Sequence, residues 1–183
     1  NDERPDPGNG VGSWDITDFW PDVIVSTLAH EFQHMINWYQ KSVAGSAGNT
    51  QIWLNEMMSM MAEDLIAGRV GFGGPRGIGP SDGSAGTPDI EDGRLSTYAA
   101  FWNDNMMQWG SSWIDYAAPY AFGSWLLRNY GGPELASGIM SNPYGDERAV
   151  EYAVHSYVGL PYDPTAPQSG LSFAELMSQW GAS

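Results

Sequence analysis

The sequence predicts a mainly α-helical fold, and three observations lead to this class. Apolar residues recur at three- and four-residue spacing over most of the chain. Short stretches rich in Gly, Pro, Asn and Asp separate these segments. At 183 residues, of which 42% are hydrophobic, the chain is long enough to bury one sizeable core. We therefore expect one domain over 1–183, with a loose terminus over 1–17 and a Gly/Pro-rich loop over 68–93.

Each expected helix has its own start or stop signal. The first begins near Asp18 to Pro21, with proline in its first turn, and runs to about Ser42. The second covers about 51–67, with Gly68 as a natural stop. Further helices are expected over 95–109, from Asp115 to a stop at Gly131, from Pro133, from about Asp146, and from a capping box formed by Ser172 and Glu175.

The first helix contains His30 and His34, four residues apart, with Glu31 beside the first histidine. Residues at this spacing share one face of a helix, so both imidazoles can bind one Zn²⁺. Zinc lowers the pKa of a bound water, and a neighbouring glutamate can take its proton as the water attacks a carbonyl. The apolar neighbours of this motif favour a mostly buried helix; the alternative is a surface helix whose histidines face solvent.

A candidate third zinc ligand, Glu56, lies in the second helix among residues expected to form core, such as Leu54 and Met57. A carboxylate in such a position is costly unless it is paired or bound to a metal. We therefore expect Glu56 to bind the same zinc; the alternative is a solvated helix edge. The chain has no cysteine, so nitrogen and oxygen atoms must supply all the ligands.

The motif His30-Glu31-x-x-His34, followed after 21 residues by Trp53-Leu54-Asn55-Glu56, resembles the gluzincin metallopeptidases. The flanking residues Thr27 to Asn37 look most like the hyicolysin type of secreted bacterial neutral metallopeptidase. The resemblance implies a zincin-like helical catalytic domain with Glu31 as general base and His30, His34 and Glu56 as zinc ligands. The residues that continue this motif in the metzincin metallopeptidases are absent from the sequence. Relatives present substrate against a β-strand upstream of the zinc helix. Because only 29 residues precede His30, we expect either that a small β-sheet edge is supplied from outside this chain or that the substrate lies differently.

The sequence departs from the gluzincin pattern at two positions. Met60 replaces the aspartate that orients one histidine in the thermolysin-like group, and Met57 replaces the glycine usual in the aminopeptidase group. A different group must then orient His30. Glu63, two turns beyond Glu56 on the same helix face, is the candidate; Ser59 or a backbone carbonyl is the alternative.

Two further residues are candidates for stabilising the transition state. The segment 115–134 resembles the gluzincin region in which a tyrosine faces the zinc, and alignment on Gly131 makes Tyr116 that tyrosine. The alternatives are Tyr120, or ordinary aromatic packing for both residues. His155 could act as a donor, as a histidine does in thermolysin-like relatives; a structural helical histidine is the alternative.

The net charge of −15, from 22 acidic and 7 basic residues, argues against nucleic acid and anionic membrane surfaces as partners. No apolar run is long enough for membrane insertion, which needs about 20 residues. The acidic, cysteine-free composition suits a secreted bacterial protein. Four acidic residues in the Gly/Pro-rich loop offer oxygen ligands for Ca²⁺, or form a solvated loop: Asp82, Asp89, Glu91 and Asp92.

These observations favour a monomeric, secreted zinc endopeptidase that acts on a protein or peptide substrate. Two alternatives stay open: an aminopeptidase of the same clan, and a non-catalytic binding or adhesion module with structural zinc. A fourth protein ligand, for example His155, would indicate the structural site.

Overall fold

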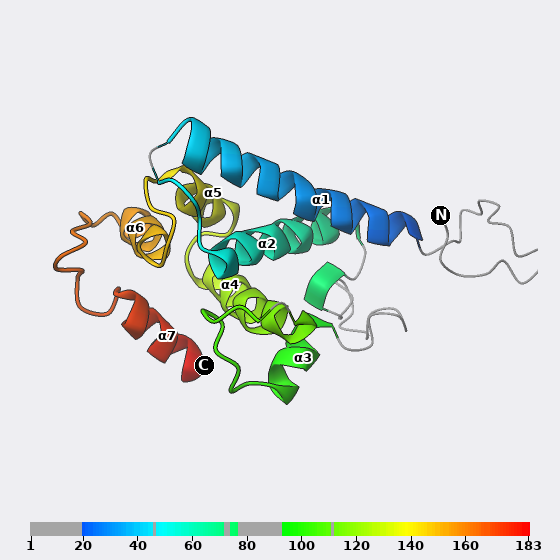
Figure 1. Cartoon of the computed structure of the whole chain (residues 1–183). Coiled ribbons are helices and arrows are strands. Elements are labelled where there is room, and N and C mark those ends of the chain that lie inside the picture. The colour runs from blue at the N-terminus through cyan, green and yellow to red at the C-terminus, as the bar shows by residue number, and fades with distance from the viewer. Residues whose placement is uncertain (1–19, 46, 72–73, 77–92, 111) are drawn as a thin grey trace, which may run out of the picture.

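The computed structural model describes residues 20–45, 47–71, 74–76, 93–110 and 112–183, and within these ranges it contains helices and no strand (Figure 1). The mainly α fold class is therefore confirmed. In chain order the elements are α1 (Trp20–Trp38), the π-helix η1 (Tyr39–Val43), α2 (Ile52–Val70), the 3₁₀ turn η2 (Gly74–Arg76), α3 (Arg94–Ala100), the 3₁₀ turn η4 (Trp113–Tyr116), α4 (Ala117–Asn129), α5 (Pro133–Ser141), α6 (Arg148–Tyr157) and α7 (Phe173–Gly181).

Helix α2 is the centre of the fold and lies between α1 and α4 (Figure 1). It is buried on several sides, as expected of a helix that is apolar nearly all round. Gly123 allows α4 to approach it closely, because a Cβ atom there would lie 2.8 Å from Met57 Cγ. The core around α2 contains Trp53, Leu54, Met57, Met58, Met61, Phe122, Leu126, Leu135, Ile139, Val150, Val154 and Leu176.

Several helix boundaries agree with the sequence. Helix α1 and η1 together run from Trp20 to Val43, close to the expected first helix. Helix α7 begins at the expected capping box, in which the Ser172 side chain accepts from the Glu175 amide and Glu175 accepts from the Ser172 amide. The turn after α4 contains Gly131 at φ 96°, a left-handed conformation that favours glycine.

Two expected boundaries are wrong. Helix α2 continues through Gly68 and ends at Gly71, which has φ 86°; the buried Ala67 packs the last turn and offsets the roughly 1 kcal/mol that a glycine costs inside a helix. The loop expected over 68–93 therefore starts later and includes the short turn η2.

The helix expected over 95–109 ends at Ala100. Polar turn residues follow, and the Asn105 side chain accepts from the Met107 amide in a local turn that competes with helix. Trp102 is 72% exposed, whereas Tyr98 and Met106 of the same segment pack in or against the core.

Lys41 anchors the end of the first helical segment to α5. The π-helical turn η1 places this lysine in the interior, where it is 1% exposed. Its ammonium donates to the carbonyls of Ile139 and Asn142, at 2.5 and 2.9 Å, and to Asn142 Oδ1 at 3.0 Å. Burial lowers the pKa of Lys41 to about 8, although the negative charge of Asp146 acts to raise it. The ammonium occupies the carboxyl end of α5, where a positive charge is favourable.

Candidate metal centre

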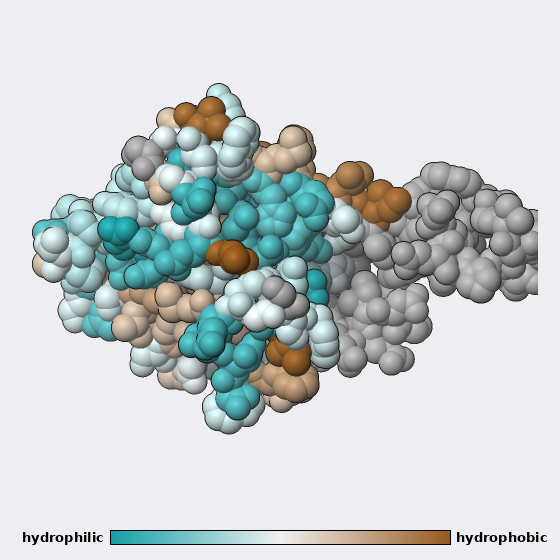
Figure 2. All heavy atoms as spheres, viewed as in Figure 1, coloured by the Kyte–Doolittle hydropathy of each residue, from teal (hydrophilic) through white to brown (hydrophobic). Residues whose placement is uncertain are grey.

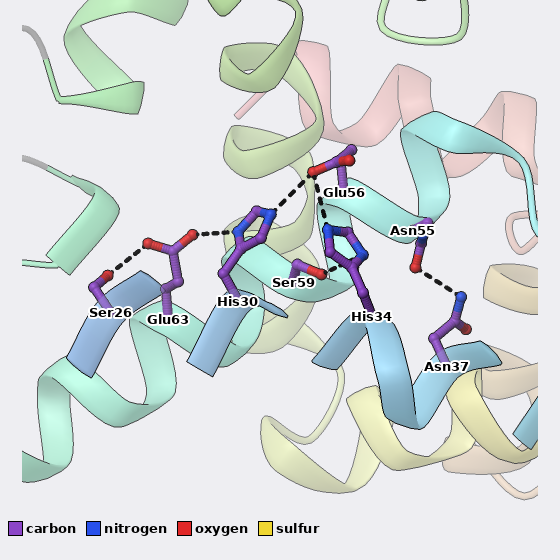
Figure 3. Close-up of polar contacts among 8 residues, drawn as sticks. All are labelled: Ser26, His30, His34, Asn37, Asn55, Glu56, Ser59 and Glu63. Atoms are coloured by element: carbon purple, nitrogen blue, oxygen red, sulfur yellow. Dashed lines mark hydrogen bonds and ion pairs between the residues drawn. The ribbon is translucent and has the colours of Figure 1, made fainter. Parts of the chain in front are cut away.

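Helices α1 and α2 run antiparallel and bring the two histidines of α1 against Glu56 of α2 (Figure 3). The distance from His30 Nε2 to Glu56 Oε2 is 3.1 Å, and that from His34 Nε2 to the same oxygen is 3.6 Å. One ligand atom from each of the three residues lies within 4.8 Å of the other two. All three side chains are partly buried, with 14–23% of each exposed.

This group fits a zinc ion. Zinc bonds to nitrogen and oxygen are about 2.0–2.1 Å long, so neighbouring atoms of a tetrahedral site lie roughly 3.3 Å apart. The two imidazole-to-carboxylate distances, 3.1 and 3.6 Å, bracket this value. The rings of His30 and His34 stand edge to face at 81°, so they approach the shared oxygen from different directions. Two imidazoles and one carboxylate are also ligands that zinc accepts in open sites.

Both imidazoles have a second partner on α2 (Figure 3). His30 Nδ1 donates to Glu63 Oε1 at 2.6 Å, and Ser26 donates to the other oxygen of Glu63 at 2.6 Å. The expectation that Glu63 orients His30 is confirmed by this contact. Ser59, the alternative partner of His30, lies instead 3.0 Å from His34 Nδ1. With each Nδ1 held by a neighbour, each Nε2 is oriented toward Glu56.

The carboxylates around His30 change its protonation. Burial lowers the pKa of His30, but hydrogen bonds and charges from Glu56 and Glu63 outweigh this effect and raise the pKa from 6.5 to about 9. The resulting ion pairs stabilise the metal-free fold fully below pH 6.5, and this contribution is lost as the pH rises through 9. A cation that binds His30 at neutral pH must therefore displace a proton.

Side-chain amide hydrogen bonds fix the register of α1 and α2 next to Glu56. The side-chain nitrogen of Asn37 donates to Asn55 Oδ1 at 2.7 Å and to Thr50 Oγ1 at 3.1 Å. Asn37 is only 3% exposed. Sequence reasoning missed this contact and the role of Ser26, although a signal was present. Ser26 and Asn37 lie on the histidine face of α1. Ser26 lies one turn before the motif, and Asn37 lies one turn after it.

Glu31 and Tyr116 lie on elements that border the metal centre. Glu31 is exposed and follows His30 on α1. Tyr116 ends η4, and its ring lies between Trp109, with ring centroids 4.9 Å apart, and the Arg94 guanidinium, 4.9 Å from the ring centroid. Burial raises the pKa of Tyr116, and the negative charges of Glu56 and Glu31 add to this shift against the positive charge of Arg94.

Tyr120 has a structural position. Its ring is fully buried in α4, and its hydroxyl donates to Asp64 Oδ1 at 2.9 Å. Arg76 pairs with the same oxygen of Asp64 at 2.9 Å. Burial raises the pKa of Tyr120, and the charge of Asp64 adds to that shift. This environment agrees with the packing alternative for Tyr120.

The surroundings of His155 agree with the structural alternative. This residue is 0% exposed, and its Nδ1 donates to the Glu151 carbonyl at 2.8 Å. Its Nε2 accepts from the Gln168 amide at 3.2 Å, and its ring packs against Tyr162. Both ring nitrogens of His155 therefore have backbone partners inside the fold. The acidic residues considered for calcium, over 82–92, lie outside the described residues.

No helix in the described part of the chain is long and apolar enough to cross a membrane. Comparison with protein families finds no matching family model, and comparison with solved structures finds no match.

Among curated proteins, the chain is similar to the neutral metalloprotease ShpI of Staphylococcus hyicus, with 28% identity over 140 residues. The similarity covers 74% of this chain and 28% of the relative, so the chain spans little more than a quarter of that protein. The sequence similarity therefore relates this chain to a metalloprotease.

Proposed function

We propose that this chain is the catalytic domain of a secreted zinc endopeptidase. The proposal assigns His30, His34 and Glu56 as zinc ligands and Glu31 as general base. The observation that carries it is the meeting of two imidazole nitrogens and one carboxylate oxygen between α1 and α2, with a second partner behind each imidazole. The similarity to a neutral metalloprotease supports the same activity.

Zinc, when bound, lowers the pKa of a water and polarises the carbonyl of a peptide bond. Glu31 accepts the proton of the attacking water and passes it to the leaving amine. The Tyr116 hydroxyl donates a hydrogen bond to the carbonyl oxygen as that atom becomes negative. Glu63 keeps His30 in the orientation that directs Nε2 at Glu56.

The number of ligands favours catalysis over a structural zinc. Structural zinc sites have four protein ligands, whereas catalytic sites have three and an open position. The potential metal-binding group found among the described residues has three members. The ring nitrogens of His155, the example considered for a fourth ligand, contact the backbone of Glu151 and Gln168.

A chelator is expected to abolish casein cleavage, because the reaction needs the metal. One equivalent of Zn²⁺ should restore it, whereas Mg²⁺, which prefers oxygen ligands, should not. The measurement is release of acid-soluble peptides, with zinc content determined in parallel. An internally cleaved peptide with a blocked amino terminus separates an endopeptidase from an aminopeptidase. Casein cleavage that continues after complete zinc removal would contradict the proposal.

Replacing Glu63 by glutamine is expected to weaken zinc binding about 10- to 100-fold, as loss of a partner behind a ligating histidine does. Glutamine keeps the size of the side chain but removes the charge that holds the His30 Nδ1 proton. Competition with a zinc-sensitive dye measures the affinity. Glu134→Gln, at an exposed position of α5, is the matched control. Equal zinc affinities for Glu63→Gln and the parent would exclude this role for Glu63.

A further inference from the structure

The outer face of the first helical segment is apolar and exposed. Sequence reasoning favoured a mostly buried helix, which is wrong for this face. We call these residues the α1 stripe, and each is 39–64% exposed: Ile24, Val25, Leu28, Phe32, Met35, Trp38, Tyr39 and Val43. Figure 2 shows brown and tan spheres along the edge of the molecule where α1 runs, beside a mainly hydrophilic face.

The α1 stripe gathers eight exposed apolar side chains on one helical segment. Monomeric proteins rarely expose contiguous apolar patches above a few hundred Å², and larger ones mark interaction sites. Leu28, Phe32 and Met35, at helical spacing, are each more than 60% exposed, and they form the centre of the stripe. The remaining members extend this row toward both ends of the segment. Such a row is the kind of surface that binds another polypeptide.

The charge of the protein indicates which kind of polypeptide fits. The net charge is −15, and three of the seven basic residues are already engaged: Lys41 is buried, Arg76 pairs with Asp64, and Arg148 pairs with Asp146. A second copy of the chain would bring another strongly negative surface to the stripe, which opposes self-association. A polypeptide with both basic and apolar residues is attracted to the negative charge of the protein and to the apolar stripe.

The position of Glu31 connects the stripe to the proposed reaction. Successive helical residues are turned by about 100°, so Glu31 lies between the His30 face and the stripe. Leu28 and Met35 are its neighbours at three- and four-residue spacing. A polypeptide bound along the stripe therefore passes beside the general base.

We infer that the α1 stripe is a docking surface that selects cationic amphipathic polypeptides as substrates. This inference rests on the proposed function and names its substrate class. Apolar side chains of the substrate cover Phe32, Met35 and Trp38, while its basic side chains face the acidic protein. Binding on the stripe raises the concentration of the substrate chain near the metal centre.

The test uses two synthetic amphipathic peptides with the same leucine positions, one with lysine and one with glutamate at all polar positions. Binding is measured in a Glu31→Gln background, in which cleavage of the peptide should be about 100-fold slower or more. The lysine peptide should bind, and the double substitution Met35→Ser with Trp38→Ser should weaken that binding at least tenfold. Trp102→Ser, at a 72% exposed position outside the stripe, is the matched control and should have no effect.

In the active protein, the ratio of kcat/KM for the lysine peptide to that for a short fluorogenic peptide should fall at least tenfold with the double substitution. Equal binding of the glutamate peptide, or binding unchanged by the double substitution, overturns the inference. So does a dimer in sedimentation that the double substitution dissociates, because the stripe then binds a second copy. If the lysine peptide binds but neither it nor casein is cut, the proposed function fails while the docking surface stands.

Discussion

Glu31→Gln is expected to reduce casein cleavage by about 100- to 10,000-fold, the range for loss of a general base, while zinc stays bound. Glutamine has the same shape as glutamate but cannot accept the proton of the attacking water. Glu31 is exposed and lies outside the group formed by His30, His34 and Glu56, so the substitution should leave the fold and the metal in place.

The kcat for casein and the zinc content of the purified variant are the two measurements. Glu134→Gln again serves as the control for loss of one negative charge, and it should retain both values. A Glu31→Gln variant with full activity would remove this residue from the mechanism. A variant that loses its zinc would instead make Glu31 a ligand.

Helical spacing was enough to predict which polar side chains of α1 and α2 meet. His30 and His34 at i and i+4 define one face of α1, and Glu56 and Glu63 at i and i+7 define one face of α2. Once these helices lie antiparallel, the polar residues of the two faces must meet, because apolar neighbours surround them. This explains why Glu63 could be proposed as the partner of His30 before the structure was considered.

Spacing did not predict the contacts that depend on how the helices are shifted along each other. Ser59 lies on the correct face of α2, but the register set by Asn37 and Asn55 places it beside His34 and not beside His30. The environment of His155 depends on the Gln168 amide, thirteen residues away, which local pattern does not reveal. The apolar pattern of α1 likewise gave no indication that the outer face of this helix remains exposed.

Glu56→Ala is expected to abolish zinc binding and casein cleavage together. Without Glu56, two neutral imidazoles remain, and no carboxylate balances the double positive charge of the cation. The site is partly buried, because only 14% of the Glu56 side chain is exposed, so it screens charge less than bulk water does. The loss of affinity should therefore exceed the 10- to 100-fold effect of removing an outer partner such as Glu63. Isothermal titration with zinc and the casein assay give the two readouts, with Glu134→Ala as control.

The same substitution should change the titration of His30 in the metal-free protein. Burial lowers the pKa of His30, and Glu56 and Glu63 together raise it to about 9, so removal of Glu56 should move it back toward its ordinary value. Proton NMR of the imidazole measures this shift, independently of metal and of activity. If Glu56→Ala binds zinc as the parent does, the third ligand is wrong. If Glu56→Ala loses zinc while the pKa of His30 falls, the loss of zinc arises from removal of the Glu56 ligand. Glu31→Gln, by contrast, is expected to lose activity while its zinc stays bound.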